Sequence, residues 1–171
     1  PNSTRWTNYY LEKNVQGDVI GVYQKEGDGN SATHILAARY SYDPYGTPTS
    51  MTNGAGTAVS QTSNTIAAIN PFRYRGYRYD GDTGLYYLQS RYYDPSVGRF
   101  LNADDTDYLG ISDTAIGWNL FAYCENNPVN SNDKFGLFTI KRWMLATPID
   151  FLLYTLAPTL EIAIAPIKSL S

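Results

Sequence analysis

Arginines and aspartates in the second half of the chain are its clearest candidates for chemistry. Two carboxyl groups that share a site have different pKa values, so that one serves as an acid and the other as a base, and a nearby arginine keeps the second one ionised. Such a group can activate a water molecule against a peptide carbonyl. Arginine–aspartate pairs are also common structural braces, so the residues alone leave both roles open. The candidates are Arg91, Asp94, Arg99, Asp104 and Asp133.

Histidine and cysteine chemistry has little support in the sequence. The chain contains one histidine, His34, and one cysteine, Cys124. A Ser-His-Asp triad would need His34, which has no supporting motif, and Cys124 has no second histidine with which to form a metal site. We interpret Cys124 as a small buried apolar residue. The sequence also lacks a P-loop or GxGxxG pattern, so we expect no metal and no cofactor.

A tyrosine-rich stretch, Asn70–Phe100, must position most of the candidate side chains. It contains seven tyrosines and five arginines, interleaved with turns rich in Asp and Gly. Tyrosine and phenylalanine favour a pleated, half-buried surface, whereas Asp, Gly and Pro supply turn geometry. We therefore predict strands at Phe72–Tyr79 and Leu85–Tyr93, with turns at Tyr79–Gly84 and Asp94–Gly98.

The mixture of rings and cations in this stretch has two interpretations. Alternation along Phe72–Tyr79 would place both kinds of side chain on each face, where a guanidinium group can lie flat on a tyrosine ring. The same mixture could stack on and neutralise a single-stranded nucleic acid. Asp80, Asp82 and Asp94 lie among the arginines, however, and the net charge of the chain is −3. We therefore expect tyrosines that pack a sheet, and no nucleic-acid partner.

Tyr-Asp pairs recur along the chain, each followed within a few residues by glycine. They are Tyr42-Asp43, Tyr79-Asp80 and Tyr93-Asp94. Recurrence of one hairpin unit indicates a repeat architecture, in which each unit buries its apolar face against its neighbours. We therefore predict YD-type hairpins over residues 1–46, with strands at Val19–Tyr23 and Ile35–Tyr42. Residues 47–69 are small and polar, and we predict a flexible connection there with a tight turn at Asn53-Gly54.

Two long motifs resemble the Rhs repeat-associated core domain of bacterial Rhs and YD-repeat polymorphic toxins, a family that includes wall-associated proteins and the C subunits of Tc toxins. The motifs are YRGYRYDGDTGLYYLQSRYYDPSVGRFLNADD and WNLFAYCENNPVNSNDKFGL, and the resemblance covers Tyr9–Leu137. It implies a mainly β fold within a hollow shell of hairpins, a core at residues 70–137 and a short mixed region, residues 101–136, that plugs the shell. It also implies that the rest of this shell is a partner, and that the protein is secreted or attached to the cell surface in bacterial competition.

The resemblance also implies a self-cleaving site of the aspartic-protease kind. Arg91 matches the arginine of the RYYDP motif, and Asp104 matches the aspartate that ends GRFLNAD. The cleavage motif of the family matches Asp133–Leu137. The scissile bond would then join Leu137 to Phe138, where the composition of the chain changes.

Proline is replaced at two positions of these motifs. Lys134 follows Asp133, so the turn before the scissile bond lacks the fixed φ of proline, and Asp105 follows Asp104. Adjacent residues of an extended segment point to opposite faces, so we do not expect Asp104 and Asp105 to form the carboxylate pair. The second aspartate is then Asp94 or Asp133, and the sequence leaves this choice open.

Helix is predicted in two places towards the end of the chain. Asn119–Tyr123 could begin a short helix capped by Asn119. Residues 138–171 are rich in Leu, Ile and Ala and lack glycine, which favours a helical tail. Asp150, Glu161 and three prolines interrupt its apolar run, so we expect packed amphipathic helices and keep membrane insertion as the alternative. The tail carries no recognisable enzyme signature.

Three functions remain in view. The first is a toxin core that encapsulates a variable tip at residues 138–171 and releases it by cutting after Leu137, with an immunity protein as a further partner of the tip. The second is a non-catalytic shell or wall-associated fragment in which Arg91 and Asp104 brace the hairpin. The third is a membrane-active tip. The chain opens at Pro1 without an initiator methionine or a signal pattern, so we expect a piece of a longer protein.

Overall fold

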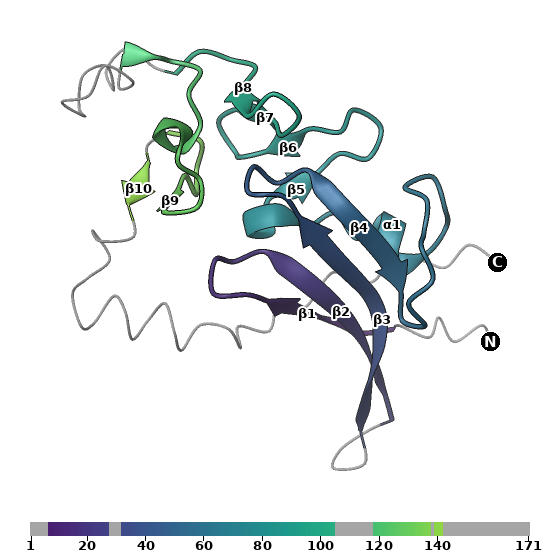
Figure 1. Ribbon diagram of the computed structural model, residues 1–171. Coiled ribbons are helices and arrows are strands. Elements are labelled where there is room, and N and C mark those ends of the chain that lie inside the picture. The colour runs from purple at the N-terminus through teal and green to yellow at the C-terminus, as the bar shows by residue number, and fades with distance from the viewer. Residues whose placement is uncertain (1–6, 28–31, 105–117, 138, 142–171) are drawn as a thin grey trace, which may run out of the picture.

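The computed structural model describes residues 7–27, 32–104, 118–137 and 139–141 (Figure 1). Within these ranges the protein is mainly β, as predicted, with two four-stranded antiparallel sheets and one two-stranded sheet. The helices with defined bounds are short: α1 (Ile66–Ile69), η2 (Tyr74–Gly76) and η5 (Cys124–Asn126). No helix within these ranges is long and apolar enough to cross a lipid bilayer.

The first sheet is a meander whose strands follow one another in chain order. Burial alternates at the end of β3, where Ala38 and Tyr40 are buried, and a register shift between Val19 and Gly21 of β2 lets Val19 and Val22 join the same cluster. This cluster packs against α1. The Tyr40 hydroxyl donates to the Ala67 carbonyl at 2.9 Å, which fixes α1 on the sheet. The strands are β1 (Tyr9–Lys13), β2 (Val19–Glu26), β3 (Thr33–Tyr42) and β4 (Pro48–Asn53).

The second sheet is smaller and is built mainly from tyrosine. Tyr86 pairs with Tyr93, and both rings are buried, whereas the next pair, Tyr87 and Tyr92, points outward with 41% and 45% exposure. This period of two is the one expected of strands. The strands are β5 (Arg78–Tyr79), β6 (Tyr86–Tyr87), β7 (Tyr92–Asp94) and β8 (Arg99–Phe100), and the two-stranded sheet is β9 (Ser131–Asn132) with β10 (Ile140–Lys141).

The three Tyr-Asp pairs share one turn geometry, which confirms the turns predicted from them. In each pair the aspartate carboxylate accepts a hydrogen bond from the backbone N–H two residues later, the pattern of an Asx turn. Because the aspartate closes its own turn, these repeats stabilise hairpins locally. The acceptors are Asp43 (2.8 Å), Asp80 (3.0 Å) and Asp94 (2.8 Å).

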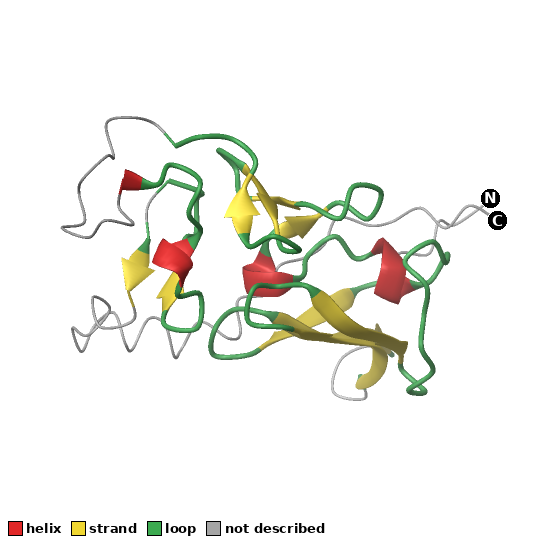
Figure 2. Ribbon diagram, turned by 45° about the horizontal axis from the view of Figure 1, so that its top comes forward, coloured by secondary structure: helices red, strands yellow, loops and turns green. Residues whose placement is uncertain are grey.

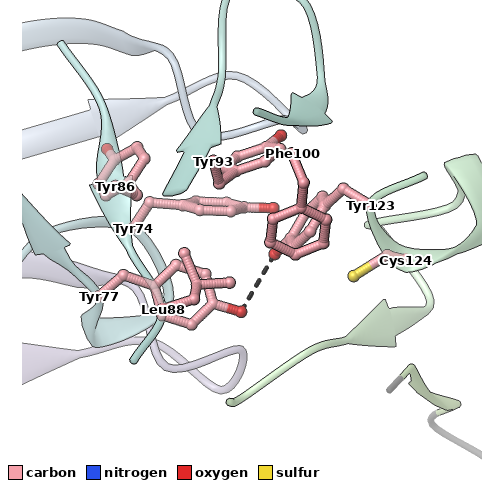
Figure 3. Packing of buried hydrophobic residues seen from close by; sticks show 8 residues of the cluster. All are labelled: Tyr74, Tyr77, Tyr86, Leu88, Tyr93, Phe100, Tyr123 and Cys124. Atoms are coloured by element: carbon pink, nitrogen blue, oxygen red, sulfur yellow. Dashed lines mark hydrogen bonds between the residues drawn. The ribbon is translucent and has the colours of Figure 1, made fainter. Parts of the chain in front are cut away.

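Tyrosine hydroxyl groups join the two larger sheets through the turn at residues 42–46. Three consecutive carbonyl groups of this turn accept hydrogen bonds from tyrosines of the second half: Pro44 from Tyr74, Tyr45 from Tyr93 and Gly46 from Tyr86. The buried rings continue into a cluster that also holds Tyr77, Leu88, Phe100, Tyr123 and Cys124 (Figure 3). Cys124 is fully buried, as predicted. Figure 2 shows α1 and η2 between the two larger sheets.

Two predictions for the first half of the chain were wrong in part. Residues 47–69, predicted to be a flexible connection, contain β4, which pairs with β3 over its whole length, and α1. The turn at Asn53 was predicted correctly. Phe72–Tyr79 is not one strand, because Arg75 has a φ of +53° and lies within η2. Its backbone N–H donates to the Asp18 carboxylate at 2.9 Å, a distant contact that local alternation does not reveal.

The later predictions have mixed outcomes. Leu85–Tyr93 is two short strands with a turn between them, in which Gln89 has a φ of +67°. Asn119 accepts a hydrogen bond from Phe121 N–H, but it begins a turn and not the predicted helix. Ile140 and Lys141 form β10 where a helical tail was expected. The rest of that prediction, and the membrane alternative with it, concerns residues 142–171, which lie outside the described residues.

Candidate functional site

Arg91 lies at the centre of the candidate site, directly before β7. The strand alternates, so that Arg91 and Tyr93 point inward while Tyr92 points to solvent. The Arg91 side chain is 5% exposed, and its guanidinium carbon is 3.6 Å from the centre of the Phe100 ring on β8. Stacking on an aromatic face holds the planar guanidinium group in a single orientation.

Two carboxylates approach the same nitrogen of Arg91. Its Nη2 atom is 2.8 Å from Asp104 Oδ2 and 3.4 Å from Asp133 Oδ2. The Asp104 side chain is 15% exposed and that of Asp133 is 3% exposed. Arg91 therefore holds together one carboxylate that follows β8 and one that follows β9, although Asp133 is 42 residues away in sequence.

Hydrogen bonds to the backbone of residues 119–122 hold Arg91 and Asp104 together. Arg91 Nη1 donates to the Leu120 carbonyl at 3.1 Å, and the Asp104 N–H donates to the same carbonyl at 3.0 Å. Phe100 N–H donates to the Phe121 carbonyl at 3.0 Å, next to an isolated bridge between Arg99 and Ala122. The segment at 119–122 thus acts as an extra edge of the second sheet and holds Asp104 beside Arg91.

Burial changes the acid–base behaviour of the site. Removal from water raises the pKa of Asp133 to about 6, and Arg91 opposes this shift without cancelling it. Burial likewise lowers the pKa of Arg91, while Asp104 and Asp133 raise it. Because Arg91 lies closer to Asp104, the negative charge is favoured on Asp104 and the proton on Asp133. The two carboxylates thus differ in burial and in their distance from Arg91, which is the kind of difference that separates the pKa values of a carboxylate pair.

The predicted cleavage motif folds directly onto this group. Asp133 Oδ1 accepts a hydrogen bond from Leu137 N–H at 3.1 Å, which closes a loop of five residues. At the start of the loop the Tyr77 hydroxyl donates to the Asp133 carbonyl at 2.6 Å. Near its end the Gly136 carbonyl accepts from Arg91 Nε at 2.5 Å and from Ser90 Oγ at 2.7 Å. The loop is thus held at both ends.

Gly136 requires its glycine. Its φ is +71°, and a Cβ atom there would lie 2.7 Å from Ser90 Oγ and 3.0 Å from the Leu88 carbonyl oxygen. Both the backbone conformation and the close approach exclude a larger residue without rearrangement. Lys134, which replaces the proline of the motif, is exposed, with its ammonium group 5.6 Å from the centre of the Phe135 ring.

The structure separates the candidates named from the sequence. Asp133 joins Arg91 and Asp104, whereas Asp94 lies in the turn after β7, where its Oδ1 accepts from both the N–H and the hydroxyl of Ser96. Arg99 is exposed and pairs with Asp94 in the strand register. Asp105 and Phe138 lie outside the described residues, so only the first residue of the predicted scissile bond is placed.

His34 and Cys124 both lie outside the group formed by Arg91, Asp104 and Asp133. His34 is exposed on β3, with its ring 5.2 Å from that of Tyr10. Burial raises the pKa of Cys124 to about 12, so its thiol stays protonated at neutral pH. Across the described ranges, no three His, Cys, Asp or Glu side chains are grouped to hold a metal ion.

Sequence reasoning missed two side chains that hold the cleavage loop. Ser90 precedes Arg91 and contacts two carbonyls of the loop, and Tyr77 contacts a third. The signal for Ser90 was its position next to a candidate arginine at the end of a predicted strand. Tyr77 is one of sixteen tyrosines, and nothing local distinguishes it from the rings that only pack the core.

Several known proteins similar to this chain are toxins or toxin subunits. The tRNA nuclease WapA of Bacillus subtilis is 35% identical over 128 residues, which is 75% of this chain and 5% of WapA. The toxin subunit YenC1 of Yersinia entomophaga is 37% identical over 121 residues, 70% of this chain and 10% of YenC1. The chain belongs to the Rhs/YD-repeat toxin family. No protein-family model matches it.

A solved structure supports the same relationship at the level of the fold. The TcdB2–TccC3 complex without its hypervariable C-terminal region matches 80% of this chain and 5% of the solved chain, with a TM-score of 0.58 and 30% identity. The chain therefore spans a small fraction of the length of these Rhs/YD-repeat relatives. The match extends the similarity from sequence motifs to the arrangement of the sheets.

Proposed function

We propose that this chain is the closing part of the repeat core of a bacterial toxin, and that it cuts itself after Leu137. The observation that carries the proposal is the folding of the cleavage motif onto Arg91, with Asp104 on one side and Asp133 on the other. The support is structural as well as sequence-based, because the arginine that binds both carboxylates also binds the backbone of the cleavage motif.

The chemistry divides between the two carboxylates. Asp104, paired with Arg91, takes a proton from a water molecule as the water oxygen attacks the Leu137 carbonyl carbon. Asp133, buried and protonated below a pH of about 6, gives its proton to the amide nitrogen of residue 138 as the carbon–nitrogen bond breaks. The products are a carboxyl group on Leu137 and a free amine on residue 138. Arg91 keeps Asp104 ionised and orients both side chains.

The biological role that we propose is based on what the relatives do. WapA is a tRNA nuclease and YenC1 is a toxin subunit, so we infer that the core encapsulates a toxic tip that includes residues 138–171, and releases it by this cut. The rest of the shell is then the partner of the chain. A secreted or surface location and an immunity protein that protects the producing cell belong to the same proposal.

A second function, a purely structural brace, has one observation in its favour. Arg91 donates to the carbonyls of both Leu120 and Gly136, so it fastens two segments to the second sheet whether or not it takes part in cleavage. A brace of this kind predicts an uncut chain.

Two substitutions separate cleavage from bracing. In the full-length protein, Arg91→Ala and Asp104→Asn should each abolish cleavage, because the first removes the group that orients both carboxylates and the second removes the base. Cleavage is read on denaturing gels with N-terminal sequencing of the released fragment. Cleavage at the wild-type rate in both variants would exclude this assignment.

A further inference from the structure

The peptide unit that joins Gly136 to Leu137 is held at both of its polar atoms. Its N–H donates to Asp133 Oδ1 at 3.1 Å, and its carbonyl accepts from Arg91 Nε and Ser90 Oγ at 2.5 and 2.7 Å. This is the peptide unit immediately before the proposed scissile bond. With its plane fixed, the direction of the Leu137 carbonyl depends only on the two backbone torsions of Leu137.

Ser90 differs from the other two groups that hold this unit, because its side chain does not ionise in this pH range. Its hydroxyl lies 2.7 Å from the Gly136 carbonyl oxygen and 2.8 Å from the Phe135 carbonyl oxygen. A hydroxyl has a single proton to donate, so it serves one of these consecutive carbonyls at a time and tolerates small movements of the loop without releasing it.

The main chain around Ser90 is well placed for this task. Ser90 lies in the tight turn between β6 and β7, where Ser90 N–H donates to the Leu88 carbonyl at 2.8 Å and Leu88 N–H donates to the Arg91 carbonyl at 2.9 Å. The same turn therefore presents Ser90 and Arg91 side by side. Leu88 is buried in the tyrosine cluster (Figure 3), which anchors the turn.

We propose that Ser90 is a positioning residue for self-cleavage, acting through the Gly136 carbonyl to orient the Leu137 carbonyl towards the carboxylate pair. This inference rests on the proposed function and adds to it a residue that touches none of the reacting atoms. Holding the reacting group near its attack geometry can account for large rate factors, and small displacements are costly.

The test compares Ser90→Ala, which removes the hydroxyl, with Ser90→Thr, which keeps it, and with Ser41→Ala as a control. Ser41 is an exposed serine on β3 whose hydroxyl lies 3.0 Å from Thr49 Oγ1. We expect Ser90→Ala to slow self-cleavage of the full-length protein about tenfold, because restoring the attack geometry of the loosened loop should cost about as much as one hydrogen bond. Ser90→Thr should restore the rate, and Ser41→Ala should not change it. The pH at which the rate is half-maximal should stay the same in all of these proteins.

A second measurement tests whether Ser90 holds the Gly136–Leu137 peptide unit, and it does not require cleavage. Hydrogen exchange of the Leu137 amide is compared in three proteins: Asp104→Asn alone, Asp104→Asn with Ser90→Ala, and Asp104→Asn with Ser90→Thr. Exchange should be faster only in the protein that carries Ser90→Ala. Unchanged exchange in that protein would show that the Ser90 hydroxyl does not hold the peptide unit.

The outcomes distinguish the positioning role from the proposed function. If wild type cleaves and Ser90→Ala cleaves equally fast, the positioning role is wrong and the proposed function stands. If wild type does not cleave at all, the proposed function is wrong, and so is the role of Ser90 in positioning the scissile bond.

Discussion

Replacing Asp133 by asparagine removes the proposed acid while keeping the shape of its side chain. The asparagine carbonyl can still accept the Leu137 N–H that now reaches Asp133 Oδ1 at 3.1 Å, but its amide cannot supply a proton. Asp94→Asn is the matched control, because Asp94 is the other carboxylate that the sequence allowed and it lies in an exposed turn. Removal of a general acid lowers a rate by about 10²–10⁴-fold, so we expect that loss in Asp133→Asn and a wild-type rate in Asp94→Asn.

The pKa of Asp133 sets the size of the pH effect in wild type. Burial raises this pKa to about 6, so about nine-tenths of the side chains are protonated at pH 5, about one-tenth at pH 7 and about one-hundredth at pH 8. If the protonated form is the one that reacts, the cleavage rate should fall about tenfold from pH 5 to pH 7 and about tenfold again by pH 8.

The same shift has a consequence for stability, with a definite sign. The pKa is higher in the folded protein than the ordinary value of 3.8, so between these values the folded state binds more protons and stability falls as pH rises. The change is roughly 2 kcal/mol between pH 4 and pH 7. Amide exchange of residues 133–137, corrected for intrinsic rates, should show this loss of protection in the uncleaved Asp104→Asn protein and not in Asp104→Asn with Asp133→Asn.

The cleavage assay starts from protein kept at pH 9, where the reaction should be slowest. Samples are moved to buffers between pH 5 and pH 8, denatured at intervals, and the uncut fraction is measured by mass spectrometry. A rate that does not change with pH over this range would refute the role of Asp133 as the acid. So would Asp133→Asn protein that cleaves as fast as wild type.

Two further substitutions test the geometry around Arg91. Arg91→Lys keeps the charge but cannot reproduce the planar set of donors to Asp104, Leu120 and Gly136; we expect at least a hundredfold loss of cleavage on denaturing gels, and a rate within twofold of wild type would show that charge alone suffices. Gly136→Ala should reduce cleavage strongly because its Cβ would lie 2.7 Å from Ser90 Oγ, whereas Gly56→Ala, with a similar positive φ and no atom within 4 Å, should cleave normally. Equal effects of the two alanines would assign the loss to backbone strain and not to the contact.

Local features of this fold could be predicted from sequence because short-range contacts produce them. The aspartates of the Tyr-Asp pairs accept hydrogen bonds from N–H groups two residues away, so a few neighbouring residues are enough to predict each turn. The strands β2 and β3 include the predicted segments Val19–Tyr23 and Ile35–Tyr42, which are rich in apolar, β-branched and aromatic residues. Strand β4 was missed because Pro48–Asn53 has little strand character of its own, and its pairing with β3 supplies the order.

The candidate site shows the same division between local and distant contacts. Arg91 and Asp104 lie within one motif and were identified together. The choice of Asp133 over Asp94 could not be made from spacing, because it depends on the fold bringing residues 42 positions apart to the same guanidinium nitrogen. Burial then gives Asp133 its raised pKa, and burial is a property of the packed chain.

The most direct test of self-cleavage is the intact mass of the full-length protein after denaturation, measured beside its Asp104→Asn variant. The proposed self-cleavage should give two fragments in wild type, with masses that place the break between Leu137 and Phe138, and one unbroken chain in the variant. A single unbroken chain in both proteins would contradict it and would leave Arg91 as a structural brace.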